Sequence, residues 1–582
     1  MVLFLLPVLF IFSVSFMLSS CTLFDNGTGG QDTLEEAEED PMVGDSLNEG
    51  TSKEEGEEED PGDEVQEELP VKIWIEDMIP EEIKNILIGR INSDPYLEQA
   101  KDSGEAEAFL EIVPAGALAN GSASYKDLDI FYVMAPSTFF FNILDEIEWE
   151  DLKAWWSGDK ESLSHISEDG IPVNMALEEQ DHNILVKILG ETANENIQIM
   201  ERSDIMEGLS DGSITISITP FDRVDKRIKV LKLSGLSVFD RELDYNRYPL
   251  AFSVMLRGED EAIIEEILSS LNDIGMTNRD MSKFTSLIMT GVTAMVRGTA
   301  QRMENHGISY PGEKIADILR EADITHISNE VPFVEGCNVF ENRFPFFCSR
   351  PEYIELLEYV GADVIELTGN HMNDHGHDWF IYTLEMYDNK GWPYYGGGRD
   401  LEESYAPAVI ESNGHKFAFL GFNWWGPAYD WATEDTPGSA PREFEEFEAI
   451  IKDLKEQGHI VIFTFQYIES YQYKPTPQQV IDFRRMIDAG ADIISGSQSH
   501  HPMGMEFYGD GFINYGLGNL FFDQMRELGT RQELIAKHIF YEGKHINTII
   551  ITAMLEDYSQ PRPATAEERS EILNSVFEAS IK

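Results

Sequence analysis

The stretch Glu366-Leu-Thr-Gly-Asn-His-Met-Asn-Asp-His-Gly376 decides how the rest of the chain is interpreted. It continues an apolar run, Asp363 to Leu367, that predicts a strand, and it places an amide, an imidazole and a carboxylate in the following turn. Open α/β folds bind ligands at the carboxyl ends of their strands. We therefore expect Asn370, His371 and Asp374 to belong to a site, with His371 and Asp374 as the catalytic candidates. The alternative is that Asn370 and Asp374 are turn and cap residues and that His371 packs structurally.

The length of the chain predicts how many domains it has, and its net charge excludes one class of partner. The chain has 582 residues, which at about 150 residues per domain predicts two to four domains. The net charge is -65, from 107 acidic and 42 basic side chains. A nucleic-acid backbone would be repelled by this surface, so nucleic acid is excluded as a partner.

Residues 1–21 resemble a bacterial lipoprotein signal peptide, because an apolar run ends in Leu18-Ser19-Ser20-Cys21. A Lys or Arg before the apolar run is missing, and the alternative is an uncleaved membrane anchor. Residues 22–69 contain 19 acidic residues and one lysine, which predicts a disordered tether. We expect lipidation at Cys21 and a location on the extracytoplasmic side of the membrane.

The predicted export of the chain favours a disulfide between the two remaining cysteines. Cys337 and Cys348 lie in one short segment, and disulfides persist outside the cytoplasm. We predict that they form a disulfide; the alternative is two free thiols.

Residues 70–258 alternate strand and helix patterns, which predicts a smaller α/β domain, and residues 259–283 read as a helix and a linker. Asp129-Ile-Phe-Tyr-Val-Met-Ala-Pro136 and Thr219-Pro-Phe-Asp-Arg-Val224 resemble solute-binding proteins of the phosphate type. That resemblance implies a ligand between two lobes. A spacer domain without a ligand is the alternative.

The chain from 284 to 560 has a β-α-β rhythm that predicts a layered α/β fold, and residues 561–582 predict a C-terminal helix or tail. Its motifs occur in a fixed order: Thr290-Gly-Val-Thr-Ala294, Ser328-Asn-Glu-Val-Pro332, Thr368-Gly-Asn-His371, Thr464-Phe-Gln-Tyr467, Gly496-Ser-Gln-Ser-His500 and Asn514-Tyr-Gly-Leu-Gly-Asn519. Over about residues 284–525 they resemble the CapA family of poly-γ-glutamate capsule proteins. The resemblance implies a four-layer metallophosphoesterase-like α/β sandwich.

The resemblance also implies site residues. Glu330, Asn370 and His500 match positions that would hold a divalent metal, Mn, Fe or Zn. The pocket positions are Gln466, Gln498, Asn519 and Asp523. Three motifs depart from the family, because Val292, Gln466 and Gln498 stand where it has an aspartate and histidines. We therefore expect a degenerate site in which a metal is possible or absent.

Three functions follow as hypotheses. The first is an extracytoplasmic lipoprotein that makes, anchors or remodels a cell-surface polymer such as a poly-γ-glutamate capsule. The second is a divalent-metal phosphoesterase or hydrolase, and the third is a solute-binding receptor. The expected partners are a surface polymer or a phosphate-like or sugar-like ligand, and the membrane through the N-terminal lipid.

Overall fold

A computed structural model describes residues 69–116, 125–167, 171–271, 274–340 and 346–582. Glu68–Lys582 forms one compact unit. The predicted signal peptide, Cys21 and nearly all of the predicted tether lie outside the described residues. Within these ranges, no helix is both long enough and apolar enough to cross a membrane.

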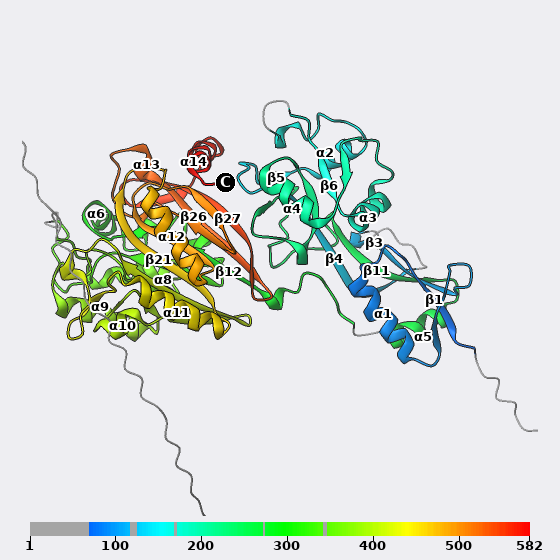
Figure 1. Ribbon diagram of the computed structural model, residues 1–582, viewed down its shortest axis with the longest axis horizontal. Coiled ribbons are helices and arrows are strands. Elements are labelled where there is room, and N and C mark those ends of the chain that lie inside the picture. The colour runs from blue at the N-terminus through cyan, green and yellow to red at the C-terminus, as the bar shows by residue number, and fades with distance from the viewer. Residues whose placement is uncertain (1–68, 117–124, 168–170, 272–273, 341–345) are drawn as a thin grey trace, which may run out of the picture. The chain divides into compact units, whose positions relative to one another are not determined.

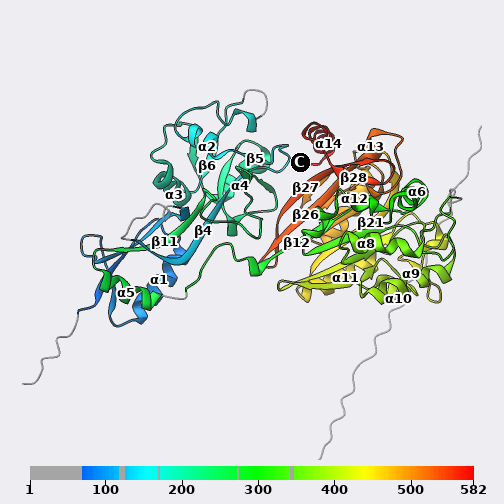
Figure 2. The same ribbon diagram turned by 180° about the vertical axis from the view of Figure 1, so that it is seen from behind.

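The first α/β part is built on a seven-stranded sheet. Its order is β2-β1-β3-β11-β4-β8, with β9 beside β4; β1 is parallel to β2 and β3, and β11 is antiparallel to β3 and β4. Helices α1 and α5 lie side by side although they are far apart in the sequence (Figures 1 and 2). The predicted α/β domain is thus present. Its elements are β1 (Val71–Ile75), α1 (Glu81–Ser93), β2 (Leu97–Gln99), β3 (Ala108–Pro114), β4 (Tyr125–Phe139), β5 (Glu146–Ile147), α2 (Trp149–Trp156), β6 (Met175–Leu177), α3 (Glu179–Leu189), β7 (Ile197–Ile199), α4 (Arg202–Asp211), β8 (Ser217–Pro220), β9 (Ile228–Val230), β10 (Lys232–Leu233), β11 (Ala251–Gly258) and α5 (Glu261–Leu271).

The second α/β part contains two large sheets. The first sheet has the order β16-β15-β14-β12-β26-β27-β28, and β13 pairs with β14 and β25. Strands β12, β14, β15 and β16 are parallel, whereas β26 to β28 are antiparallel. The strands are β12 (Phe284–Met289), β13 (Val292–Thr293), β14 (Ile324–Asn329), β15 (Val364–Glu366), β16 (Tyr394–Tyr395), β25 (Asn519–Phe521), β26 (Gln532–Tyr541), β27 (Lys544–Glu556) and β28 (Gln560–Pro563).

The second sheet has the order β18-β19-β21-β22-β24-β23. Its central strands, β19, β21, β22 and β24, are parallel. The carboxyl ends of these strands therefore point in one direction, as those of β12 to β16 do in the first sheet. The strands are β18 (Ala408–Ser412), β19 (His415–Asn423), β21 (Ile460–Ser470), β22 (Ile493–Ser499), β23 (Met505–Tyr508) and β24 (Gly511–Asn514); the short strands β17 (Gly397–Gly398) and β20 (Gly438–Ser439) pair with each other.

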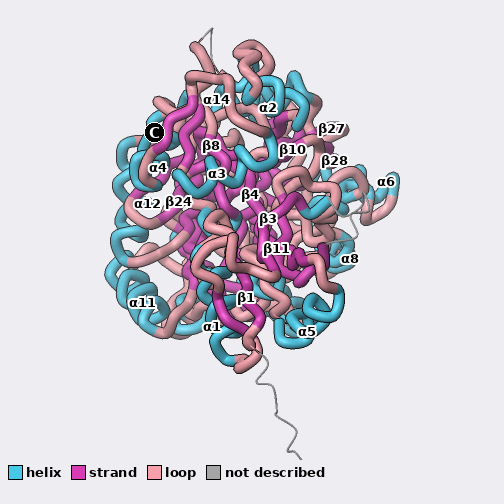
Figure 3. The backbone as a smooth tube through the Cα atoms, turned by 90° about the vertical axis from the view of Figure 1, so that its right-hand side faces the viewer, coloured by secondary structure: helices cyan, strands magenta, loops and turns pink. Residues whose placement is uncertain are grey.

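Alternating side chains divide the core into layers. In β12, Leu287 packs with Phe419 and Ile462 between the two sheets, whereas Ile288 packs on the helical side of the first sheet. In β21, Phe463 faces the other way from Ile462 and packs against α11 and α12. The expected four-layer α/β sandwich is confirmed. Figure 3 shows α11 and α12 at one margin of the strands and α6 and α8 at the opposite margin. The helices of this part are α6 (Arg297–His306), α7 (Ala316–Arg320), α8 (Ile354–Tyr359), α9 (His377–Lys390), α10 (Leu401–Tyr405), α11 (Phe444–Glu456), α12 (Pro477–Ala489), α13 (Leu528–Arg531) and α14 (Ala566–Ala579).

The C-terminal segment is a helix that belongs to the sandwich. A capping box fixes the start of α14, because the Thr565 hydroxyl accepts from the Glu568 amide while the Glu568 side chain accepts from the Thr565 amide. Leu573 and Phe577 are buried in the core between the sheets. Strand β28 crosses the predicted boundary at residue 560, so the sandwich does not end there.

Candidate functional site

Strands from both sheets deliver polar side chains to one cluster. Glu330 directly follows β14, and Asn370 lies four residues after the end of β15. Gln466 and Gln498 belong to β21 and β22 of the other sheet. Parallel strands in each sheet bring these positions to the same end of the sandwich, where α/β folds bind ligands.

The Gln466 amide lies at the centre of this polar cluster, which we define as Glu330, Asn370, Gln466 and Gln498. Its Nε2 atom lies 3.1 Å from Glu330 Oε1 and 3.1 Å from Asn370 Oδ1, and it also donates to Gln498 Oε1. Glu330 is 3% exposed and Gln466 is 1% exposed. Side chains separated by up to 168 positions in the chain therefore meet in a largely buried contact.

Unusual backbone geometry supports this contact. Gln498 has a φ of +67°, in the left-handed region that a glutamine seldom adopts. A Cβ on Gly369 would lie 2.7 Å from Glu330 Cα, so only glycine allows this approach of the two turns. Such positions concentrate at sites where the surrounding structure enforces them.

His371 and Asp374 form a pair beside the cluster. His371 Nδ1 lies 2.7 Å from Asp374 Oδ2, and the Tyr429 hydroxyl donates to Asp374 Oδ1 at 3.2 Å. Burial lowers the pKa of His371, but the hydrogen bond to Asp374 and the charge of Glu330 outweigh burial and raise it above 6.5. The pair thus favours a protonated imidazole near the cluster.

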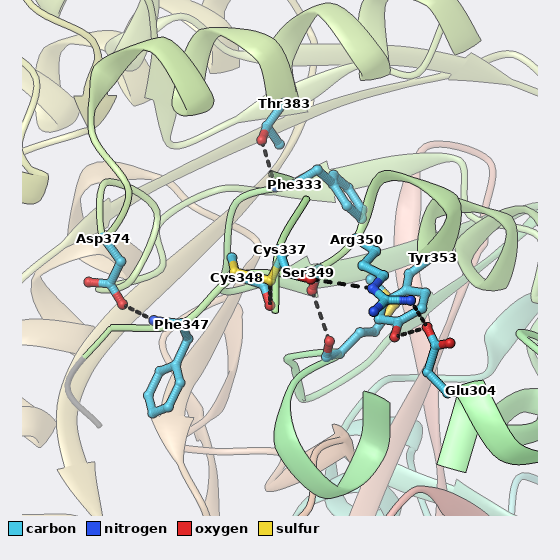
Figure 4. Close-up of a disulfide and its surroundings, with 11 residues drawn as sticks. Glu304, Phe333, Cys337, Phe347, Cys348, Ser349, Arg350, Tyr353, Asp374 and Thr383 are labelled. Carbon is cyan, nitrogen blue, oxygen red and sulfur yellow. Dashed lines mark hydrogen bonds and ion pairs between the residues drawn. A yellow bond between two sulfur atoms is a disulfide. The ribbon is translucent and has the colours of Figure 1, made fainter. Parts of the chain in front are cut away.

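The predicted disulfide is present, and the segment that it closes contacts the His371–Asp374 pair. Cys337 and Cys348 are bonded, which confirms the expected pairing. The Phe347 amide, next to Cys348, donates to Asp374 Oδ2 at 2.7 Å, as Figure 4 shows. The Phe347 ring meets the His371 ring edge-on, with centroids 4.7 Å apart. The crosslinked segment therefore supports both partners of the His371–Asp374 pair.

His500 is held by Asn519. His500 Nδ1 lies 2.8 Å from Asn519 Oδ1, while Asn519 Nδ2 donates to the Thr530 carbonyl at 3.0 Å. Asn519 is fully buried, so its contacts position the imidazole and leave little surface for a ligand. This contact sets the ring plane of His500, whose Nε2 atom lies 3.8 Å from Glu469 Oε1.

Asp523 has a different partner from the other predicted residues. Its carboxylate pairs with Arg297 and accepts from the Gly298 amide at 2.9 Å. The Arg297 guanidinium lies 4.9 Å from both the Phe347 and the Phe522 ring centroids. Asp523 therefore fixes an arginine at the side of the site, and among the described residues it makes no hydrogen bond to Gln466. Its assignment to the pocket remains a prediction.

Asp430 is a site neighbour that the sequence did not indicate. It is fully buried, and its Oδ1 accepts from the Asn373 amide at 2.8 Å. Its other oxygen has no hydrogen-bond partner in the described part of the chain. Burial raises the pKa of Asp430 to about 8, and the nearby Asp374 carboxylate adds to this effect. Burial thus favours the protonated form of Asp430.

A second polar group lies between the sheets below the cluster. Glu366 accepts from Thr368 Oγ1 at 2.5 Å and lies 3.4 Å from His326 Nε2. That nitrogen also lies 2.8 Å from the Tyr395 hydroxyl. Burial raises the pKa of Glu366, but the contacts with His326 and Thr368 outweigh it and leave the pKa below 4.5. Glu366 is therefore a buried carboxylate that is stabilised by its contacts with Thr368 and His326.

Comparison with known proteins now identifies the family. A family model described as Bacterial capsule synthesis protein PGA_cap matches residues 286–524. The chain is 26% identical to the capsule biosynthesis protein CapA of Bacillus anthracis, over 50% of this chain and 71% of the relative. It is 30% identical to the PGA biosynthesis protein CapA of Bacillus subtilis (strain 168), over 44% of this chain and 68% of the relative. The chain belongs to the PGA_cap family.

Among solved structures, an ABC-type phosphate transport receptor from Vibrio cholerae is 12% identical with a TM-score of 0.29. The likeness covers 34% of this chain and 93% of the receptor. The TM-score is too low to support a fold or a function for the first α/β part. The PGA_cap match, in contrast, spans every residue of the polar cluster.

The side chains of the polar cluster differ from the usual ligands of two divalent cations. Such a centre requires a bridging carboxylate and several charged or imidazole ligands. Val292 is buried and apolar, and the Gln466 amide donates hydrogens towards the oxygens that would face a cation. Among the described residues, no group of three or more His, Cys, Asp or Glu side chains is placed to hold a metal ion. Val292 and Gln466 thus supply neither a carboxylate nor an imidazole to such a centre.

Proposed function

We propose that this protein takes part in making, anchoring or remodelling a cell-surface polymer such as a poly-γ-glutamate capsule. The observation that carries the proposal is the PGA_cap match over residues 286–524, whose motif residues meet in one polar cluster. The relatives named for capsule or PGA biosynthesis support the same role. In this proposal the protein acts outside the cytoplasm, attached to the membrane through a lipid on Cys21.

We further infer that the cluster binds its ligand instead of hydrolysing it through two metals. Gln466 supports this view, because an amide that donates to Glu330 and Asn370 takes the place of a cation. Glu330, Asn370 and His500 remain the candidate ligands for a single Mn, Fe or Zn ion. Gln466, Gln498, Asn519 and Asp523 remain the candidate binding residues.

Deleting the gene in its own host tests the role. Loss of surface polymer, restored by the wild-type chain, would support the proposal. An Asn370→Ala, His371→Ala double variant should restore less polymer, whereas His377→Ala, an exposed neighbour on α9, should restore it fully. Unchanged polymer after deletion would overturn the proposal. Cell fractionation of a Cys21→Ala variant tests the lipid anchor, which predicts release of that variant from the membrane.

A metal-dependent phosphoesterase is the second candidate. The His371–Asp374 pair favours it, because a protonated imidazole beside the neutral acid Asp430 is suited to proton transfer. Metal analysis of the purified chain and turnover of a generic phosphodiester test it together. Turnover that requires an added divalent cation and falls at least a hundredfold in His371→Ala would favour this candidate over the binding site.

A solute receptor is the third candidate. Charged side chains meet at the strand ends of the first α/β part, where Lys187 Nζ lies 2.6 Å from Glu76 Oε1 and Arg223 Nη1 lies 3.0 Å from Glu178 Oε2. A charged ligand that competes with a partner in one of these ion pairs would change the melting temperature of the first α/β part. A thermal shift of the full chain on adding phosphate, lost in Arg223→Ala, would support the receptor; no shift would oppose it.

A further inference from the structure

Three side-chain oxygens of the polar cluster share one donor nitrogen. The Gln466 Nε2 atom carries two hydrogens, yet three oxygens converge on it, from Glu330, Asn370 and Gln498. At least one of these oxygens is therefore left without a hydrogen from Gln466. That oxygen can accept a hydrogen from a ligand hydroxyl or amide, which would complete its hydrogen bonding.

The charge of the cluster also selects its ligand. Glu330 brings a carboxylate into the cluster, and residues 284–582 contain 46 acidic and 22 basic side chains. Phosphate or polyglutamate would meet like charge at this position. The Arg297 guanidinium is paired with Asp523 and the His371 imidazole is paired with Asp374, so neither is free to offset it. An uncharged ligand with several hydroxyl groups suits this environment better.

Two exposed tyrosines contact side chains next to the cluster, one through Asp374 and the other through His500. Tyr429 is 48% exposed, and its hydroxyl donates to Asp374, the partner of His371. Tyr471 is 46% exposed, and its ring centroid lies 5.3 Å from that of His500. The two tyrosines come from different loops, one before β20 and one after β21.

A tryptophan pair adjoins the same strand. The Trp424 amide donates to the Gln466 carbonyl at 2.9 Å, which ties this pair to the centre of the cluster. Trp425 is 60% exposed and stacks on Trp424 with an interplanar angle of 6°. Aromatic faces pack against the C–H face of a pyranose ring, while a few placed acceptors bind its hydroxyls.

We propose that the polar cluster and these aromatic residues bind an uncharged sugar unit of a cell-surface glycan. Its hydroxyls donate to the side-chain oxygens of Glu330, Asn370 and Gln498 that share the Gln466 amide, and its ring packs on Tyr429 or Tyr471. This inference rests on the proposed function, since it assigns a ligand class to the same site. The site binds this sugar unit irrespective of which surface polymer the cell makes.

Binding to the purified full chain tests the proposal. The probe is a tetramer of N-acetylglucosamine, titrated by calorimetry, with poly-γ-glutamate of similar mass as the rival ligand. We expect the tetramer to bind and its Kd to rise about tenfold in Tyr429→Ala and in Tyr471→Ala. Tyr96→Ala, which removes a tyrosine that is 55% exposed in the first α/β part, should leave the Kd unchanged.

The opposite outcomes would overturn the inference. They are no binding of the tetramer, an equal effect of Tyr96→Ala, or tighter binding of poly-γ-glutamate than of the sugar. The gene-deletion experiment reports separately on the proposed function. Loss of surface polymer without sugar binding would refute the sugar site alone, whereas sugar binding with unchanged surface polymer would refute the polymer role alone.

Discussion

Asp430→Asn is expected to remove a pH dependence of stability that the buried carboxyl group imposes. Asn keeps the shape of the protonated acid and cannot ionise. In the folded protein the pKa of Asp430 is about 8, against 3.8 for an ordinary aspartate. A group with a raised folded pKa contributes most stability below its unfolded pKa, and this contribution is lost as pH rises towards the folded pKa. The relevant window therefore runs from about pH 4 to pH 8.

The magnitude follows from these two values. Each difference of one in pKa corresponds to about 1.36 kcal/mol, so the whole window is worth at most roughly 6 kcal/mol. From pH 5 to pH 7 the wild type should lose about 2 to 3 kcal/mol of its free energy of unfolding through Asp430, and the Asp430→Asn variant should not. Near pH 4 the two proteins should differ little.

Urea unfolding followed by tryptophan fluorescence measures this difference, because Trp424, Trp425 and Trp431 surround Asp430 in the sequence. Asp435→Asn is the matched control, since it makes the same change at an exposed position of the same loop. Parallel stability profiles of wild type and Asp430→Asn from pH 5 to pH 8 would refute the reasoning. A gain of the same size in Asp435→Asn would do so as well.

Three more predictions concern the supports of the site. Replacing Cys337 and Cys348 with serine should lower the free energy of unfolding by roughly 2 to 4 kcal/mol in urea, because the open segment gains entropy when unfolded; an unchanged midpoint would contradict this. Gln466→Glu would set a second carboxylate against Glu330, so Mn²⁺ should raise the melting temperature of this variant more than that of the wild type; equal shifts would oppose this interpretation of the cluster. Glu366→Gln breaks a buried charged contact and should cost roughly 3 kcal/mol by denaturation, and a cost near zero would show that the carboxylate is not needed.

Patterns among neighbouring residues were sufficient to predict many of the helices and strands. The apolar run before Gly369 predicted β15, and the β-α-β rhythm from residue 284 predicted a layered α/β fold, because strand and helix periodicity are properties of neighbouring residues. The four-layer sandwich was implied by the resemblance to the CapA family. The cysteine pairing was also predictable, since a short segment and export both favour a disulfide. The turn Asn370 to Asp374 indicated a site for the same reason, as its polar residues follow one strand directly.

Tertiary structure alone decided which atoms meet. Nothing near Gln466 in the sequence shows that its amide faces Glu330 and Asn370, because these residues come from two sheets that pack face to face. Asp430 gave no local signal either, since its raised pKa comes from burial and from the charge of Asp374, which is distant in the sequence. Neighbouring residues determined the elements and the place of the site, whereas its charge and hydrogen bonding were set by contacts between distant segments, which only the packing of the sheets brings together.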